Sequence, residues 1–278
     1  MLIAILTLVT LVAFAANSRL CRMALGDNHI DPVSFTTVRI ASGALILIPL
    51  ARFTTESATD SKRQGSWGSG LALFFYAGAL SLAYISLDTG MGALILFGSV
   101  QATMIGAGIV SGEQPRAIQW IGIVTALGGL AYVVWPGMSA PDLKGAILML
   151  LSGIAWGAYS LRGKGVSAPI ATTAGNFVRA VPMAVCGSII AFATIHYENI
   201  GIVLALVSGT ITSALGYVLW YRVLRNLSTT QAAIVQLLVP VIAAFGGVAF
   251  LTEQVTTRLI ISSVLILGGV AVTVLHPP

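Results

Sequence analysis

Two arginines interrupt long apolar runs of this sequence. Arg39 lies within TTVRIASGALILIPL, and Arg179 lies within NFVRAVPMAVCGSII. Arginine keeps its charge at any physiological pH, and taking that charge out of water is costly unless polar groups surround it. Both side chains are therefore expected to face protein or water, and the chemistry that they offer is ion pairing.

The composition places these arginines in a lipid bilayer. Of the 278 residues, 57% are hydrophobic and only 8% are charged, and the mean hydropathy is +0.95. Soluble chains carry about 25% charged residues, and a soluble fold of this size could not hide so much apolar surface. The net charge of +5 is scattered in single residues and pairs, so we expect no nucleic-acid partner.

Ten apolar runs are long enough to cross a bilayer, whose core of about 30 Å needs roughly 20 helical residues. Main-chain polar groups in lipid must be satisfied within the segment, which predicts helices. Residues 1–16 also resemble a signal peptide, but they lack a basic leading region, and we interpret them as the start of the first helix. The ten runs are 2–24, 32–53, 67–87, 90–111, 116–135, 143–161, 171–194, 200–221, 229–251 and 256–275.

The basic residues predict the orientation of these helices. With the N-terminus in the cytoplasm, eight Lys and Arg residues fall at inner loops and four at the outer side, which is the bias expected of a multi-pass inner-membrane protein. Both termini are then cytoplasmic. The inner residues are Arg52, Lys62, Arg63, Arg116, Arg162, Lys164, Arg222 and Arg225, and the outer ones are Arg19, Arg22, Lys144 and Arg258.

The sequence repeats itself at an offset of 140 residues, with landmarks in the predicted second, fourth and fifth helices. A shorter shift of 133 residues aligns Tyr84 with Tyr217 in the third and eighth helices. The landmarks at the main offset are Arg39 with Arg179, Glu113 with Glu253, and LGGLA at 127–131 with LGGVA at 267–271.

The repeat predicts two domains, residues 1–138 and residues 139–278, each with five helices. Because five is an odd number, the second domain must enter the membrane from the opposite side. We therefore expect an all-α polytopic membrane protein of ten transmembrane helices in two inverted five-helix repeats. Inverted repeats are the architecture of alternating-access transporters, which bind their substrate near the bilayer midplane at the repeat interface.

The ten helices, the inverted repeats and the Gly-Glu pair at residues 112–113 resemble the EamA-type transporters of the drug/metabolite transporter superfamily. The second copy departs from the pattern, since Thr252 precedes Glu253. The resemblance covers the whole chain and implies an inner-membrane permease for small metabolites, often an exporter of amino acids. The YddG-like exporters of aromatic and neutral amino acids are one subgroup that the resemblance suggests.

The repeat also suggests partners for the two arginines. Arg39 is eight residues after Asp31, or roughly 12 Å from the outer end of its helix. Glu253 lies on the same side, whereas Glu113 lies on the side of Arg179. We expect ion pairs of Arg39 with Glu253 and of Arg179 with Glu113, which would close the two mouths alternately. The alternative is that each arginine reaches carbonyls or headgroups.

Polar and aromatic side chains at bilayer depth are the candidates for substrate binding. Gln101 and Gln236 lie on faces of small and amide residues that suit a cavity wall, and Trp156 lies between Gly153 and Gly157, which bring another helix close. The alternative is that the amides only join helices and that the aromatic residues mark the interface. The complete list is Gln101, Gln236, Trp156, Tyr159, Asn176, Tyr76, Tyr84 and Phe97.

We expect a secondary transporter that exports small metabolites, with amino acids as the first candidates. Drugs, quaternary amines or nucleosides are alternative substrates, and an intramembrane lipid-modifying enzyme or a receptor subunit are alternatives of other classes. The sequence has no catalytic or metal-binding motif, so we expect no enzyme activity, cofactor or metal. The partners expected are a small-molecule substrate and the lipid bilayer, and ten helices can enclose a pathway in a monomer.

Overall fold

The computed structural model describes residues 2–53, 64–110, 116–135, 137, 140–227, 235–236, 238–251 and 253–275, with side chains as far as residue 272. Ten long helices lie in these residues if α8, η3 and α9 are counted as one continuous helix. The helices are α1 Leu2–Gly26, α2 Pro32–Phe53, α3 Trp67–Ala83, α4 Thr89–Val110, α5 Ala117–Val134, α6 Leu143–Gly163, α7 Pro169–Ile190, α8 Asn199–Val207, η3 Ser208–Leu215, α9 Gly216–Leu224, α11 Leu238–Leu251 and α12 Thr257–Leu275.

These helices confirm the predicted all-α membrane architecture. Seven of the helices that the structure describes are long and apolar enough to cross a membrane, and three shorter apolar helices accompany them. The largest differences are at the ends of two spans. The third was predicted to reach residue 87 but ends at Ala83, because residues 84–88 form the turn into α4, and the seventh was predicted to reach residue 194 but ends at Ile190. Of the predicted ninth span, the structure describes residues 235–236 and the part from Leu238 onward.

Local sequence signals explain where several helices begin. Pro32 opens α2, where its missing N–H costs nothing, and the Asp31 side chain accepts hydrogen bonds from the main-chain N–H groups of Val33 and Ser34. Asp142 caps α6 in the same way by accepting from the N–H of Gly145. These caps satisfy donors that would otherwise be left open at a helix end.

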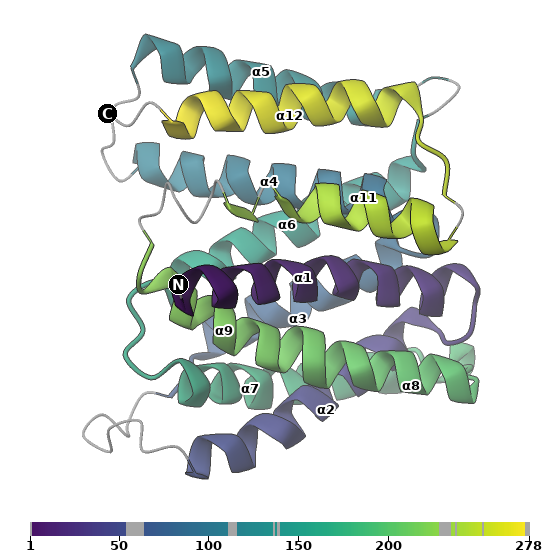
Figure 1. Ribbon diagram of the computed structural model, residues 1–278. Coiled ribbons are helices and arrows are strands. Elements are labelled where there is room, and N and C mark those ends of the chain that lie inside the picture. The colour runs from purple at the N-terminus through teal and green to yellow at the C-terminus, as the bar shows by residue number, and fades with distance from the viewer. Residues whose placement is uncertain are drawn as a thin grey trace.

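The packing of the helices follows the predicted inverted repeat (Figure 1). Three helices of the first half lie directly against their counterparts in the second half, namely α2 against α7, α4 against α11 and α5 against α12. α1 begins and α12 ends on the same side of the molecule, which we call the terminal end. The opposite side, where α1 ends and α2 begins, is the distal end.

Two groups of helices gather around the first helix of each half. In the α6 bundle, α6 packs against both α3 and α4. In the α1 bundle, α1 packs against the continuous helix α8–η3–α9 and against α11. The α1 bundle therefore repeats the α6 bundle in inverted form, and α2 and α7 lie against each other beside both bundles.

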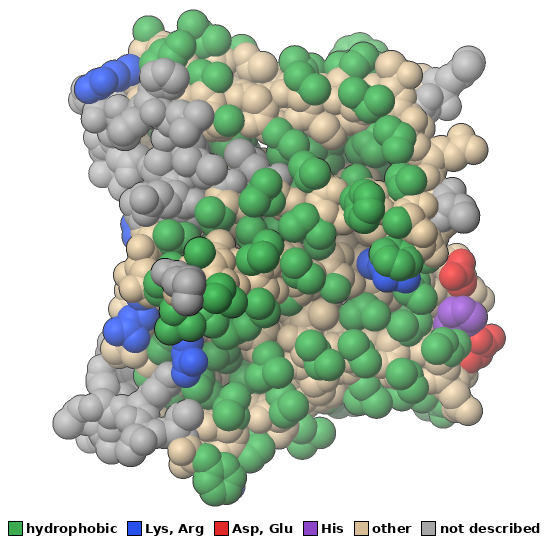
Figure 2. All heavy atoms as spheres, viewed as in Figure 1, with side chains coloured by type: hydrophobic (Ala, Val, Ile, Leu, Met, Phe, Trp, Pro, Cys, Tyr) green, Lys and Arg blue, Asp and Glu red, His purple; other side chains and the backbone are tan. Residues whose placement is uncertain are grey.

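The surface shows how this fold meets its surroundings (Figure 2). Hydrophobic side chains cover the flank of the helices. Lys and Arg side chains gather at the left end of the view, which is the terminal end, with others nearer the right, whereas Asp, Glu and His side chains gather at the distal end. An apolar belt between two polar ends is the surface that a bilayer requires.

Close contact between α5 and α12 generates a first prediction. A Cβ atom added at Gly269 would lie 2.6 Å from the main-chain N of Ala126, whereas one added at Gly268 meets no atom within 4 Å. We expect Gly269→Ala to lower the thermal unfolding temperature in detergent, because overpacking typically costs about 1–3 kcal/mol. The matched control Gly268→Ala should leave it unchanged, and equal temperatures for both variants would contradict the close packing.

Candidate functional site

Arg39 lies in the interior of the helix bundle, where its side chain is only 1% exposed. Its Nε donates to Ser213 Oγ at 2.9 Å, and its Nη2 donates to the hydroxyls of Tyr217 at 2.8 Å and Tyr76 at 3.4 Å. Its Nη1 has a longer contact of 3.9 Å with Cys21 Sγ. These four partners come from α1, α3, η3 and α9, so the arginine joins the two halves of the chain.

The partners that the described part of the chain gives Arg39 are all uncharged. Among the residues that the structure describes, the ion pairs are Arg22 with Asp88 and His29 with Glu198, and neither involves Arg39. A buried cation is normally paired, because burial without a counter-charge is expensive. Here hydroxyl dipoles hold the charge in place of an anion.

The predicted ion pair between Arg39 and Glu253 is therefore wrong for this structure. Glu253 instead accepts hydrogen bonds at the start of α4, from the N–H of Thr89 at 2.8 Å, the hydroxyl of Thr89 at 2.7 Å and the N–H of Gly90 at 3.4 Å. The open N–H groups and the dipole of a helix N-terminus attract a carboxylate. The start of α4 therefore binds the Glu253 carboxylate, which the sequence predicted to pair with Arg39.

The other predicted pair cannot be compared in full, because Glu113 lies outside the described residues. Arg179 donates from Nη1 to the main-chain oxygens of Gln64 at 2.9 Å and Gly175 at 2.8 Å. Carbonyl binding of this kind was the alternative left open by the sequence. The two symmetry-related arginines thus differ, since Arg179 binds main-chain oxygens and is only partly buried.

Aromatic rings from both bundles pack together beside Arg39. The Arg39 guanidinium carbon lies 5.3 Å from the centre of the Tyr76 ring. Trp156 contacts the rings of Tyr76 and Tyr217 at centroid distances of 4.8 and 4.6 Å and stacks on Tyr159 at 5.4 Å. We call this group the aromatic cluster, and its members are Phe14, Tyr76, Trp156, Tyr159, Phe177, Tyr217, Trp220 and Tyr221.

Small residues of α6 position Trp156. A Cβ atom added at Gly153 would collide with the main chain of Leu96, and one added at Gly157 would lie 3.4 Å from the oxygen of Val100. This confirms that the GxxxG step around Trp156 brings another helix close, and that helix is α4. Because α4 occupies this face of α6, the Trp156 side chain is held among the rings of the aromatic cluster.

A π-helix supplies one of the three hydroxyls around Arg39, that of Ser213. η3 is the π-helical segment of the continuous helix Asn199–Leu224, and a Cβ atom at Gly209 would collide with the main chain of Arg39. The Asn17 side-chain oxygen accepts from Ser208 Oγ at 2.7 Å and from Thr212 Oγ1 at 3.0 Å. π-helical turns widen the helix and often mark functional sites, and this one brings Ser213 to the arginine.

The predicted substrate-binding residues fall into two groups. Tyr76, Trp156 and Tyr159 belong to the aromatic cluster, and Asn176 joins them because its Nδ2 donates to the Tyr159 hydroxyl at 3.4 Å. Tyr84 is buried at the distal end of α3, in contact range of α4. Phe97, Gln101 and Gln236 are also buried, the first two on α4 and the third just before α11. A role in binding remains a prediction for all of them.

Sequence reasoning did not select three residues that complete the site. Tyr217 was visible as the counterpart of Tyr84 in the repeat, and that alignment was the signal that could have found it. Ser213 and Asn17 gave no comparable signal, because a serine or asparagine in an apolar helix usually joins helices. Cys21 is a free thiol that is buried beside Arg39.

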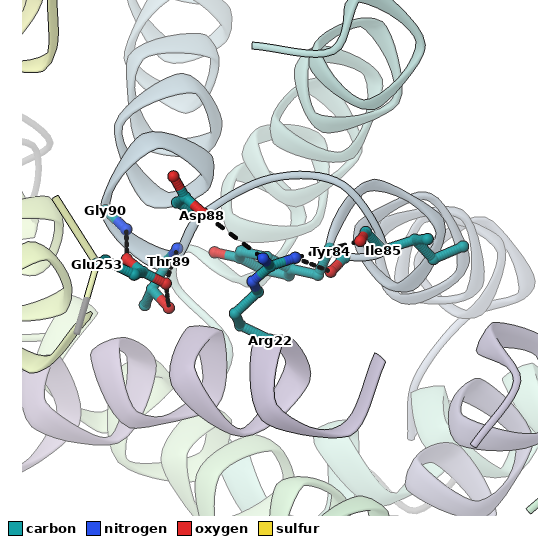
Figure 3. Close-up of polar contacts among 7 residues, drawn as sticks. All are labelled: Arg22, Tyr84, Ile85, Asp88, Thr89, Gly90 and Glu253. Atoms are coloured by element: carbon teal, nitrogen blue, oxygen red, sulfur yellow. Dashed lines mark hydrogen bonds and ion pairs between the residues drawn. The ribbon is translucent and has the colours of Figure 1, made fainter. Parts of the chain in front are cut away.

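Two contacts at the distal end connect the α1 bundle with the α6 bundle (Figure 3). Arg22 of α1 pairs with Asp88 at 3.6 Å and donates to the main-chain oxygens of Tyr84 and Ile85 in the turn between α3 and α4. Glu253, which follows α11, reaches the start of α4 as described above. At the distal end, two sets of polar contacts therefore join the α1 bundle to the α6 bundle.

A cavity of about 270 Å³ lies beside these contacts, between the ends of α4, α6, α11 and α12. Its wall includes Asp88, Asp142, Glu253, Met91, Ala244 and Leu259. Glu253 thus belongs both to the wall of this cavity and to the cap of α4.

The geometry defines a class of protein: a polytopic membrane protein of two inverted halves with a buried cationic and aromatic site between them. Comparison with known sequences identifies the family. The profile of the EamA-like transporter family matches residues 1–135 and again residues 143–275. The chain belongs to this family of membrane transporters, within the drug/metabolite transporter superfamily.

Several relatives align with most of the chain. An uncharacterized protein of Pseudomonas aeruginosa is 46% identical over 96% of this chain and 92% of its own. The threonine/homoserine exporter RhtA of Escherichia coli is 29% identical over 80% of this chain and 74% of its own, and the uncharacterized transporter YoaV of Bacillus subtilis is 22% identical over 89% of each. A solved crystal structure that is 17% identical has the same fold, with a TM-score of 0.64 over 98% of this chain and 97% of its own.

The hydroxyls around Arg39 give a second prediction. Tyr217→Phe removes the acceptor at 2.8 Å, and Tyr76→Phe removes the one at 3.4 Å from the same Nη2 atom. A hydrogen bond to a charged group is worth about 1.5–3 kcal/mol when it is short and well formed. We expect Tyr217→Phe to lower the thermal unfolding temperature in detergent more than Tyr76→Phe does. The reverse order would contradict the assignment of Tyr217 as the main partner.

Proposed function

We propose that this protein is a secondary transporter that moves small metabolites, with amino acids as the first candidates, out of the cell by alternating access. The buried polar site where the two inverted halves meet carries this proposal, because transporters of such architecture bind substrate at the repeat interface. The similarity to an amino-acid exporter supports the substrate class. Tyr76, Trp156, Tyr159 and Asn176 would line the substrate site, since Tyr76 contacts Arg39 and the other three adjoin it in a chain of contacts.

We further propose that the protein lies in the inner membrane with both termini in the cytoplasm. The gathering of Lys and Arg side chains at the terminal end supports this orientation, because basic residues are retained on the cytoplasmic side. The distal end would then face the outside. The two domains, 1–138 and 139–278, would act as the moving halves, and a single chain would enclose the pathway.

Glu253 would act as a gate through α4 instead of through Arg39. Its bonds to Thr89 and Gly90, together with the contacts of Arg22, tie the α1 bundle to the α6 bundle at the distal mouth. Breaking these ties would open the aromatic cluster toward the outside. At the terminal end, Arg179 and Glu113 remain the proposed gate residues, and Arg39 takes the role of a central cation.

An export assay tests the proposed function. Cells that overproduce the protein should tolerate growth-inhibiting concentrations of the amino acid that it exports, and should release it faster than cells with an empty vector. The panel would include threonine, homoserine and the aromatic amino acids, which also addresses the YddG-like subgroup. The purified protein in proteoliposomes should show saturable exchange of the same compound. Wild-type protein that moves no member of the panel would refute the proposal.

The gate gives a third prediction, which uses the two native cysteines. Cys21 is buried at the central site, and Cys186 is exposed. In a Cys186→Ser background, Glu253→Gln should raise the rate at which a membrane-impermeant thiol reagent, added at the distal side, modifies Cys21. We expect an increase of a few fold, because a charge at a helix N-terminus is worth about 0.3–2 kcal/mol.

Glu198→Gln is the matched control for this measurement, since it removes the same charge at the distal end. Glu198 pairs with His29, and both residues adjoin helices α1, α2 and α8, which pack together. Neutralising Glu198 should therefore leave the labelling of Cys21 unchanged. Equal rates in the two variants would remove Glu253 from the gate.

A further inference from the structure

We propose that Arg39 binds the carboxylate group of the transported molecule, so that the substrates of this protein are small carboxylic acids or zwitterions. This inference rests on the proposed function and names the chemistry of its substrate. It also assigns Arg39 a role different from the gate that the sequence suggested.

The charge of Arg39 is the first argument. The side chain is 1% exposed, and its partners among the described residues are three hydroxyls and one thiol, all neutral. Stability alone does not explain such a residue, because a well-packed apolar side chain serves a buried position at least as well as a buried charge. Charged residues at bilayer depth mark substrate pathways. A substrate carboxylate would supply the missing negative charge.

The hydrogen bonds of Arg39 leave one part of the guanidinium weakly held. Nε and Nη2 donate to hydroxyl oxygens, whereas Nη1 has within the described chain only the Cys21 sulfur, at 3.9 Å. Sulfur is a weak acceptor, so exchanging it for a carboxylate oxygen would strengthen the bonding at Nη1. Guanidinium and carboxylate groups match in geometry and form paired, charge-assisted hydrogen bonds.

A second open donor lies in the same cluster. The indole Nε1 of Trp156 is buried and has no hydrogen-bond partner in the part of the chain that the structure describes. Trp156 and Arg39 both contact Tyr76, the former at 4.8 Å between ring centroids and the latter at 5.3 Å. A buried donor without a partner is costly, and a bound molecule with oxygen acceptors would satisfy it. Ring faces would then surround the rest of that molecule, and they also attract an ammonium group.

The same charge excludes one class of alternative substrate. A quaternary amine without a carboxylate would place a second positive charge beside a permanent cation in a water-poor site, where like charges repel strongly. The symmetry mate Arg179 does not offer an equivalent site, because main-chain oxygens of Gln64 and Gly175 already bind its Nη1. Of the two symmetry-related arginines, Arg39 is thus the one whose donors remain available to a carboxylate.

The first test compares substrates that differ only at the carboxylate. Wild-type protein in detergent would be titrated with threonine and threonine amide, and with phenylalanine and its amide, with tryptophan fluorescence as the readout. We expect each amino acid that binds to bind about tenfold or more tightly than its amide, which lacks the carboxylate; this is the factor of one charge-assisted hydrogen bond. Equal affinities within the pairs would overturn the inference, whether or not the export assay succeeds.

The second test changes the arginine. Arg39→Lys keeps the positive charge but loses the planar guanidinium, whose paired N–H groups match a carboxylate. The variant should therefore reduce the preference for acid over amide severalfold. Arg39→Gln should abolish the preference. Arg258→Gln, the same change on α12 outside the site, should retain it. If Arg39→Gln does not fold, the lysine variant and the comparison of acids with amides in the wild-type protein still test whether Arg39 binds the carboxylate. A lysine or glutamine variant with the full wild-type preference would overturn the inference.

Transport and binding can fail separately. Wild-type protein that exports amino acids and their amides equally well would keep the proposed function and refute the role of Arg39. Wild-type protein that binds acids in preference to amides, but exports none of them, would support the role of Arg39 and refute the exporter.

Discussion

The charge of Arg39 is the constraint on which the interior of this protein depends. A cation that is enclosed by helices needs dipoles directed at it from several sides. α2 therefore has to approach η3 closely, which Gly209 permits, and Ser213 and Tyr217 have to come from the second half of the chain. Asn17 in turn holds η3 from the side of α1. The residues that surround Arg39 are therefore also residues that join the two halves of the chain.

The fold could be predicted from the sequence almost completely, since lipid allows few alternatives. Apolar runs of about 20 residues must be helices, and the odd number of helices per repeat determines the inversion. Helix ends were less certain. The third span seemed to continue to residue 87 because Tyr84 and Leu87 are apolar, but hydropathy does not register the tight turn that Glu253 stabilises at the start of α4.

The site could be predicted only in part. Trp156, Tyr159 and Asn176 were found because large or polar side chains are rare at bilayer depth. The contact of Ser213 with Arg39 was not predicted, because the π-helix changes the angle between successive side chains and no residue type indicates that change in the sequence. The pair of Arg39 with Glu253 was wrong for another reason. The repeat predicted that both residues lie on one side of the membrane. The N–H groups at the start of α4 compete for the Glu253 carboxylate, however, and no residue type in the sequence marks such a main-chain site.

The unequal lengths of two equivalent helices have a thermodynamic consequence. α3 has 17 residues, whereas its counterpart Asn199–Leu224 has 26 and includes the π-helical segment. Two identical halves would give inward-open and outward-open states of equal free energy, and these halves are not identical. In the alternating access proposed above, the resting protein would therefore favour one state over the other. Such a bias would not set the net direction of flux, but it would give the two sides of the membrane different apparent affinities for the same solute.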